Sequence, residues 1–368
     1  MKKLTPFLLA AVLVAAGCNT GTSIGENETI KIGVIAPMTG NSAAYGQEMQ
    51  RILDYALDKV NANYAEAGYQ FELVYEDGQC GTVAANAFQK LTDVDGIQYV
   101  LGGACSSESL AIAPLLEEKD VVAISALSSS PELDGISPNF FSLSYSDAGN
   151  AEGIAAEMSK YTKVAILTEQ NDYNIALHDS VLAALGEGVE VVADETVTKG
   201  ATDFRNALQK VKAAEPEIVF FNPNVGVTAE TMIKQLAEMD WAVQKIGTFT
   251  LMDESYLTLA PEVLEGTLVV DTPKITSAEF VAMSEAVTTA KGTVEDLGAF
   301  YTAATYDALT TLAEAIVNGK NVPADVLAGL RSGTFEGYLG SISFGDETFV
   351  KGIGTAVYSV KDGVWTQM

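Results

Sequence analysis

Two serine-rich segments are the parts of this sequence whose residue types could do chemistry. The first, GGACSSE at 102–108, lies between an apolar run at 97–101 and an apolar-periodic run at 110–116. That order predicts a strand, a glycine turn and the start of a helix. A helix start leaves backbone N–H groups without partners and carries the positive end of the helix dipole. Serines there either cap the helix or help to hold an anion such as a carboxylate.

The second segment, SALSSSPEL at 125–133, directly follows another apolar run at 121–124, which also reads as a strand. One serine turn alone is explained well enough as an ordinary helix cap. Two such turns at the ends of neighbouring strands favour a site, because together they could clamp a small carboxylate.

Strand-like runs alternate with helical runs along most of the chain, which predicts an α/β fold with mostly parallel sheets covered by helices. The pattern forms two similar units, and the second begins near Asp147. We expect strands at 29–36, 71–75, 98–101, 121–124, 164–167, 189–192, 217–221, 243–247, 266–270, 339–344, 354–360 and 364–366, and helices at 43–60, 84–91, 110–116, 151–161, 176–185, 231–239, 278–290 and 300–317.

Ligands of open parallel sheets bind beyond the carboxyl ends of the strands. Both serine segments lie at such ends, and so do Tyr173 and the segments 222–224 and 248–250 of the second unit. A cleft between the two units is therefore the expected binding site.

The N-terminus has the features of an export signal. Lys2 and Lys3 precede an apolar core at 7–14, which is too short to span a bilayer, and small residues then lead to Cys18. This arrangement resembles a bacterial lipobox, in which the cysteine is lipidated, and a polar tether follows at 19–28. The alternative is a plain secretory signal with a chance cysteine. Either interpretation places the mature chain outside the cytoplasm.

The two other cysteines, Cys80 and Cys105, would meet an oxidising compartment, which favours a disulfide between them. A metal pair is the alternative. The chain has a single histidine and no third soft ligand, so we expect no metal and no other cofactor.

The chain of 368 residues has a formal net charge of −28. Nucleic-acid phosphates would be repelled by such a surface, so we expect no nucleic-acid partner and no membrane contact other than the N-terminal lipid. A hydrolase that uses Ser106 or Ser128 is disfavoured, because His178 is the only histidine and no Gly-x-Ser-x-Gly motif is present.

Several motifs then coincide: IGVIAPMTG at 32–40, AYG at 44–46, Cys80 with CSS at 105–107, SPEL at 130–133, YDA at 306–308, and the closing stretch at 335–344. On these residues, the chain from Thr29 to its end resembles the type I periplasmic binding proteins, in particular the branch that binds branched-chain amino acids.

The resemblance implies two Rossmann-like lobes that are joined by three hinge crossings and close on a ligand. We place the crossings near 144–146, 271–273 and 344–352. The expected division is a signal peptide at 1–17, a lipidated cysteine and tether at 18–28, a first lobe at 29–145 plus 273–345, and a second lobe at 146–272 plus 346–368.

The resemblance also implies residue roles. Cys80 and Cys105 form a disulfide in that family. Ser106 meets the ligand carboxylate together with the backbone of Leu127 and Ser128 and the hydroxyl of Ser129. Further contacts come from aromatic side chains: Tyr45 on the first lobe, Tyr173 closing from the second lobe, and Phe300 or Tyr301 lining the side-chain pocket.

The chain departs from the family where relatives use a second-lobe glutamate for the ligand ammonium. That position falls within 247–250, which contains Phe249 but no acid, and Asp253 is among the nearest acids. An unpaired buried ammonium would cost several kcal/mol. Either Asp253 swings in, or the ligand carries an amide or hydroxyl that suits Asn222, Asn224 and Thr250.

The expected function is that of a lipid-anchored, monomeric binding protein that is not an enzyme. It would deliver a small carboxylate, an amino acid of branched-chain type, to the permease and ATPase of an ABC importer. The alternative is a binding or sensory module for amides, urea or other solutes on the same fold.

Overall fold

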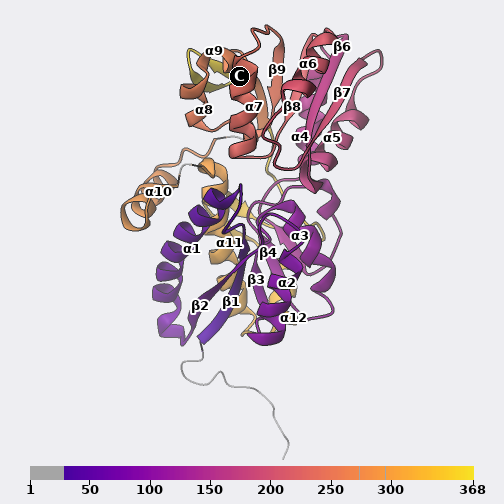
Figure 1. The fold of residues 1–368 in the computed structure, drawn as a ribbon. Helices are drawn as coiled ribbons and strands as arrows, with labels where there is room; N and C mark the ends of the chain where they lie inside the picture. Colours follow the sequence, from indigo (N-terminus) through magenta and orange to yellow (C-terminus); the bar gives the residue numbers. More distant parts are fainter. Residues whose placement is uncertain (1–28, 273, 295) are drawn as a thin grey trace, which may run out of the picture.

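The computed structural model describes residues 29–272, 274–294 and 296–368, and it contains two α/β lobes stacked end to end (Figure 1). The sequence-based expectation of a two-lobed α/β fold with mostly parallel sheets is thereby confirmed. The signal sequence, Cys18 and the tether, together with Pro273, lie outside the described residues.

The first lobe is built on a five-stranded parallel sheet with the order β2-β1-β3-β4-β5. Its strands are β1 (Thr29–Ala36), β2 (Gln70–Asp77), β3 (Tyr99–Leu101), β4 (Val122–Ser125) and β5 (Phe140–Ser142). Every residue of β3, β4 and β5 is buried, as in parallel sheets with helices on both faces.

Apolar helix faces cover this sheet on its two sides. One core joins α1 (Ala43–Tyr64), α10 (Ala278–Lys291), α11 (Gly298–Asn318) and α12 (Pro323–Ser332) to the sheet. A second core joins α2 (Ala84–Gln89) and α3 (Ser106–Ile112) to the opposite face. A short hairpin of β11 (Phe335–Gly337) and β12 (Gly340–Ile342) completes the lobe.

The second lobe contains a seven-stranded sheet with the order β14-β13-β10-β9-β8-β6-β7. Five strands are parallel, and β13 and β14 add an antiparallel edge. The strands are β6 (Lys163–Gln170), β7 (Glu190–Thr198), β8 (Ile218–Asn222), β9 (Gln244–Gly247), β10 (Leu268–Asp271), β13 (Ala356–Lys361) and β14 (Val364–Gln367). The helices are α4 (Asp147–Met158), α5 (Asp172–Ala184), α6 (Arg205–Ala213), α7 (Val227–Ala237), α8 (Glu254–Leu259) and α9 (Pro261–Leu264).

The chain passes between the lobes three times, after β5, after β10 and after β12. Hydrogen bonds join the crossing segments. The Tyr145 hydroxyl donates to Asp271 (2.7 Å), the Tyr358 hydroxyl donates to the carbonyl of Thr272 (2.6 Å), and Val350 N–H donates to Ser142 (2.9 Å). The crossings therefore form one connected hinge.

Three helices begin earlier than the apolar periodicity predicts. α3 begins at Ser106, α4 at Asp147 and α5 at Asp172, in each case about four residues before the expected start. The first turns of these helices are polar and are stabilised by capping residues. The apolar periodicity starts only after them, so it predicts a later helix start. Asn171, for example, accepts a hydrogen bond from Asn174 N–H (2.9 Å) and thereby caps α5.

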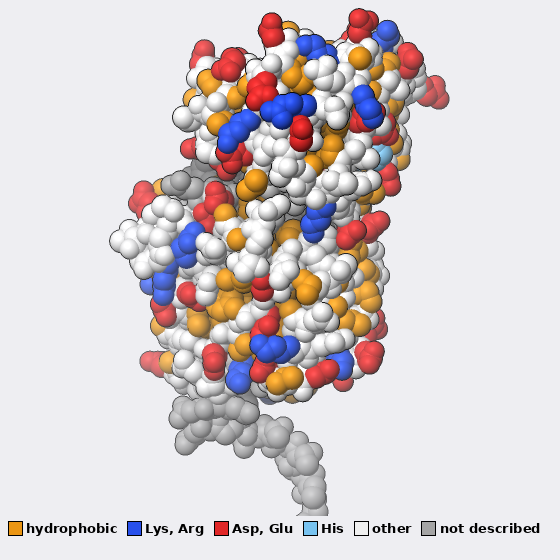
Figure 2. All heavy atoms as spheres, in the orientation of Figure 1, with side chains coloured by type: hydrophobic (Ala, Val, Ile, Leu, Met, Phe, Trp, Pro, Cys, Tyr) orange, Lys and Arg blue, Asp and Glu red, His pale blue; other side chains and the backbone are white. Residues whose placement is uncertain are grey.

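Acidic side chains are spread over the visible face of both lobes, with Lys and Arg between them, and they form no single acidic patch there (Figure 2). Within the described part of the chain, no helix combines the length and apolar character that a membrane span requires.

Candidate functional site

A cavity of about 60 Å³ lies between the lobes, at the carboxyl ends of strands from both sheets. This is several times the roughly 10–15 Å³ that a single water needs, so the cavity has the scale of a small metabolite. It is lined from the first lobe by Pro37, Ser42, Tyr45, Cys80, Ala104, Cys105, Ser106, Ser107, Leu127, Ser129 and Tyr301, and from the second by Asn171, Tyr173, Lys199, Asn224, Val225, Phe249 and Thr250.

Most residues that the sequence singled out therefore line one cavity. The structure brings together Tyr45, Cys105, Ser106, Leu127, Ser129, Tyr173, Asn224, Phe249 and Tyr301. Two predicted residues, Ser128 and Asp253, are not among the lining residues.

The two serine turns are joined directly through Ser106. Its Oγ accepts hydrogen bonds from the N–H groups of Ser129 (3.3 Å) and Ser130 (3.2 Å). The Ser106 side chain is thus fixed between the start of α3 and the turn that follows β4. Because Ser106 and Ser129 both line the cavity, this junction of the two turns lies at its wall.

The Ser128 side chain faces the interior of the first lobe, whereas the expected role of this residue concerned its backbone. Its hydroxyl donates to the carbonyl of Gly103 (2.9 Å) and lies 2.7 Å from Ser109 Oγ. Its N–H donates to Ser125 Oγ (3.0 Å), as does the N–H of Leu127 (3.3 Å). These buried polar groups satisfy one another, so Ser128 supports the turn instead of lining the cavity.

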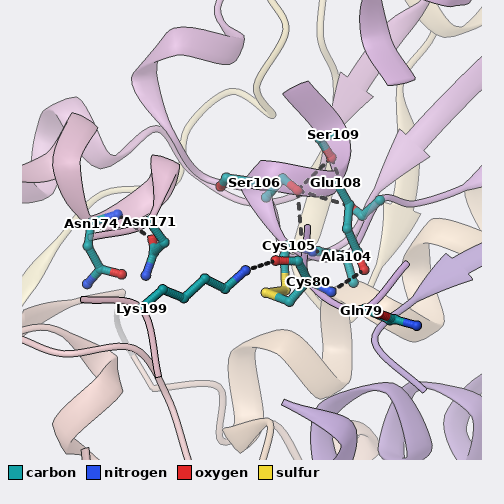
Figure 3. Close-up of a disulfide and its surroundings, with 12 residues drawn as sticks. Gln79, Cys80, Ala104, Cys105, Ser106, Glu108, Ser109, Asn171, Asn174 and Lys199 are labelled. Atoms are coloured by element: carbon teal, nitrogen blue, oxygen red, sulfur yellow. Dashed lines mark hydrogen bonds between the residues drawn. A yellow bond between two sulfur atoms is a disulfide. The ribbon is translucent and has the colours of Figure 1, made fainter. Parts of the chain in front are cut away.

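The predicted disulfide between Cys80 and Cys105 is present and ties the turn after β2 to the start of α3 (Figure 3). Beneath it, the fully buried carboxylate of Glu108 accepts the N–H groups of Cys80 (2.9 Å) and Cys105 (3.0 Å). Burial raises the pKa of Glu108 to about 7, and these backbone hydrogen bonds partly oppose the rise. The wall of the cavity is therefore braced by a covalent bond and a buried acid.

Lys199 reaches across the cavity from the second lobe. It follows β7, and its Nζ donates to the carbonyl of Cys80 in the first lobe (2.8 Å), a contact visible in Figure 3. The two lobes thus touch on the outer side of the cavity as well as at the hinge. Sequence reasoning missed Lys199 because the expected strand at 189–192 ended well before it, whereas β7 continues to Thr198.

Aromatic side chains form part of the cavity wall. The Phe249 ring lies 5.1 Å from the Tyr301 ring and 6.3 Å from the Tyr173 ring, measured between centroids. Of the two residues expected at the side-chain pocket, Tyr301 lines the cavity, whereas Phe300 packs edge-on against Tyr145 (5.8 Å). Both lobes therefore contribute to one aromatic surface.

The second-lobe turns offer amide and hydroxyl groups but no acid. Asn224 lines the cavity while its N–H donates to the buried Glu169 (2.7 Å). Asn222 is turned away, because it is fully buried and bonded to Asn174. Asp253 caps α8 by accepting Ser255 N–H (2.7 Å), and it borders a neighbouring opening. The swing of Asp253 into the site is therefore not seen.

Two acids lie at the hinge: Asp147, which is fully buried, and Asp271, which is partly buried. Asp147 is the first residue of α4, and Asp271 is the last residue of β10. Burial raises the pKa of Asp147 to about 7, although nearby Ser129 and Asn150 act to lower it. Burial also raises the pKa of Asp271 to about 6, opposed by the hydrogen bond from Tyr145. Sequence reasoning used Asp147 only to mark the second unit.

Comparison with known proteins agrees with this architecture. A family model described as periplasmic binding protein matches residues 29–363. The chain is 26% identical over 384 residues to the leucine-, isoleucine-, valine-, threonine- and alanine-binding protein of Pseudomonas aeruginosa, with 100% of both chains covered. It is 29% identical over 351 residues to a Leu/Ile/Val-binding protein homolog of Brucella abortus, covering 90% of this chain and 89% of that protein.

Solved structures show the same fold. A solute-binding protein of an ABC transporter from R. palustris, in complex with 4-hydroxybenzoate, superposes with a TM-score of 0.80 at 20% identity, covering 93% of this chain and 96% of that one. The substrate-binding protein LivJ from Streptococcus pneumoniae, in complex with isoleucine, superposes with a TM-score of 0.76 at 24% identity, covering 93% and 100%. Family and fold identify a solute-binding protein, not an enzyme, that acts outside the cytoplasm. The chain belongs to the periplasmic binding protein family.

Proposed function

We propose that this protein binds a small carboxylate-bearing solute, an amino acid of branched-chain type, in the cavity between its lobes and delivers it to an ABC importer. The observation that carries the proposal is the junction of the two serine turns at the cavity wall, where Ser106 Oγ meets the Ser129 turn. Because Ser106 Oγ accepts both of these N–H groups, its own hydrogen is left to donate, which suits a ligand carboxylate.

The rest of the cavity suits an aliphatic or aromatic side chain. Tyr45, Phe249 and Tyr301 supply ring surface, and the Phe249–Tyr301 contact spans the two lobes. A ligand held between these rings would contact both lobes at once, which is how a hinged clamp gains differential affinity for its closed state. The names of the Pseudomonas and Brucella relatives support branched-chain amino acids as the solutes.

We further propose that Cys18 carries a lipid anchor, that the mature protein is a monomer, and that a permease and an ATPase receive its ligand. The basis for the anchor is the lysine-rich start, the short apolar core and the small residues before the cysteine. Incorporation of labelled palmitate that disappears in Cys18→Ala supports the anchor. Labelling that persists in the variant contradicts it.

A second candidate ligand class is aromatic or amide solutes without an ammonium group. The absence of an acid from the lining residues that the structure describes favours this class, as does the 4-hydroxybenzoate complex of the R. palustris protein. The same cavity would then hold the carboxylate at the serine turns and a ring between Tyr173 and Tyr301.

A thermal-unfolding screen separates the two classes. The protein is first unfolded and refolded to remove any bound ligand, then heated with branched-chain amino acids, 4-hydroxybenzoate, amides or urea. A ligand of about 1 µM affinity at about 1 mM stabilises by roughly 4 kcal/mol, which shifts the midpoint by several degrees. Shifts with leucine, isoleucine or valine support the proposal. Shifts with ammonium-free solutes alone move the protein to the second class, and no shift with any of them contradicts the proposal.

A further inference from the structure

A second cavity adjoins the one in which we place the ligand. It has a volume of about 280 Å³, compared with about 60 Å³ for the first, which we call the inner cavity. The two cavities have three lining residues in common, and all three carry aromatic rings: Tyr45, Phe249 and Tyr301. These rings therefore form a wall between the inner cavity and its larger neighbour, which we call the outer cavity.

This ring wall is assembled from both lobes. Tyr45 lies on α1 and Tyr301 on α11, both in the first lobe, whereas Phe249 begins the short 3₁₀ helix Phe249–Leu251 that follows β9 in the second lobe. The Phe249 ring meets the Tyr301 ring edge-on, with 5.1 Å between the centroids. Phe249 is thus the part of the wall that the second lobe supplies, and its contact with Tyr301 depends on the closeness of the two lobes.

The backbone that carries Phe249 is fixed, although its ring is only half-buried. Thr248 precedes the 3₁₀ helix and caps it, since its Oγ1 accepts the N–H of Thr250 (3.4 Å) and lies 3.1 Å from the Thr250 hydroxyl. From this base the ring packs against the apolar core of the first lobe. The position of the ring is therefore well defined, while little of the second-lobe core depends on it.

The outer cavity is suited to an apolar group without negative charge. Its lining includes the apolar side chains of Met252, Ile275 and Phe300. Four acids, Asp253 and Glu254 among them, also line it, against one lysine among the lining residues that the structure describes. These acids would repel a second carboxylate on a ligand. An uncharged extension of an apolar side chain is the group that the outer cavity can receive best.

Resting on the proposed function, we propose that Phe249 is a specificity-determining residue, which limits the length of the ligand side chain by closing the inner cavity against the outer one. Solutes with compact side chains fit with the ring in place. Without the ring the two cavities join, and the outer cavity becomes a subsite for solutes with longer apolar side chains. The turn at 247–250, which lacks the acid expected from the family resemblance, thereby acquires a role in selecting ligands by size.

The size of the effect follows from how apolar pockets discriminate. A wall that cannot move aside excludes a longer side chain by steric clash, which is a repulsive element of specificity. A difference of a single methylene group in such a pocket changes affinity by roughly tenfold to two-hundredfold. Removal of a whole ring from the wall should therefore change the preference between a short and a long ligand by at least about tenfold.

The experiment compares leucine with homophenylalanine, whose longer side chain ends in a phenyl ring, by calorimetric titration of the refolded full chain. We expect the unaltered protein to bind leucine more tightly by at least about tenfold. In Phe249→Ala, the affinity for homophenylalanine rises by at least about tenfold, while that for leucine does not rise. The control Met252→Ala enlarges the outer cavity but leaves the ring wall in place, so the ratio of the two affinities stays unchanged.

The outcomes separate this inference from the function on which it rests. If the unaltered protein binds leucine and Phe249→Ala shows no gain for homophenylalanine, the proposed function stands and the role of Phe249 is overturned. Equal binding of the two ligands by the unaltered protein overturns that role as well. If neither ligand binds the unaltered protein, the proposed function fails and this inference falls with it. Phe249→Leu, which keeps an apolar side chain at this half-buried position, decides the matter by the same gain or its absence if Phe249→Ala does not fold.

Discussion

The replacement Asp147→Asn is expected to stabilise the ligand-free protein, and to do so more at high pH than at low pH. Asparagine keeps the size of the side chain and its acceptor for Asn150 while removing the buried charge. The pKa of Asp147 is about 7 in the fold and 3.8 in the unfolded chain. Between these values the folded state holds a proton that the unfolded state has lost, so stability falls as the pH rises through this window.

The size of the effect follows from the two pKa values. Each pH unit between them contributes about 1.4 kcal/mol. Relative to a pH below both values, Asp147 therefore lowers the free energy of unfolding by about 1.6 kcal/mol at about pH 5 and by about 4 kcal/mol at about pH 8. Above the folded-state pKa this loss does not grow further. The variant removes this cost, so its advantage over the unaltered protein should grow by about 2.5 kcal/mol between the two conditions.

Urea unfolding of refolded, ligand-free protein measures this difference. The fluorescence of Trp241 and Trp365, which both pack in the second lobe, reports the transition. The exposed Asp58→Asn on α1 serves as the control and should change stability by no more than about 0.5 kcal/mol at either pH. An advantage of Asp147→Asn that is equal at both pH values would refute the reasoning, because it would mean that Asp147 does not titrate in this range.

Three further outcomes are expected. Ser106→Ala should weaken ligand binding and also lower the unfolding midpoint, since it leaves two buried N–H groups without their acceptor, at about 1–3 kcal/mol; unchanged urea curves would contradict this. Removing the disulfide with Cys80→Ser should cost about 3.5 kcal/mol, from the 25-residue loop that it closes, and reductant should have no effect on that variant. Tyr173→Ala should weaken binding while leaving the ligand-free midpoint nearly unchanged, and a large drop in that midpoint would assign Tyr173 to the core.

The sequence was sufficient to predict the layered fold and most of the cavity. Apolar strands that alternate with helices imply parallel sheets. Because ligands of such sheets bind beyond the carboxyl ends of the strands, the sequence pointed to the segments that hold Ser106, Ser129, Tyr173 and Asn224, all of which line the cavity. The disulfide also followed, from the compartment and from the family resemblance.

What the sequence could not predict depends on the direction of single side chains. Leu127, Ser128 and Ser129 share one turn, yet only the first and third line the cavity, because Ser128 satisfies the buried carbonyl of Gly103. The direction of each side chain in this turn depends on the packing of its neighbours, which the spacing of residues along the sequence does not reveal.

The hinge acids escaped prediction for a different reason. Asp147 and Asp271 come from separate crossings, and only the folded hinge places them in one hydrogen-bonded chain through Tyr145. Likewise, the contact between Lys199 and the carbonyl of Cys80 joins residues of different lobes, so it exists only in the folded arrangement of the two lobes.

The most direct test of the account is a calorimetric titration of refolded, ligand-free protein with isoleucine near neutral pH. We predict saturable binding of one isoleucine per chain with an affinity of about 1 µM or tighter, which corresponds to a binding free energy of about −8 kcal/mol. Binding should weaken in Ser106→Ala, whose side chain joins the two serine turns. The absence of binding by isoleucine, leucine and valine, in protein that unfolds cooperatively, would contradict the central claim.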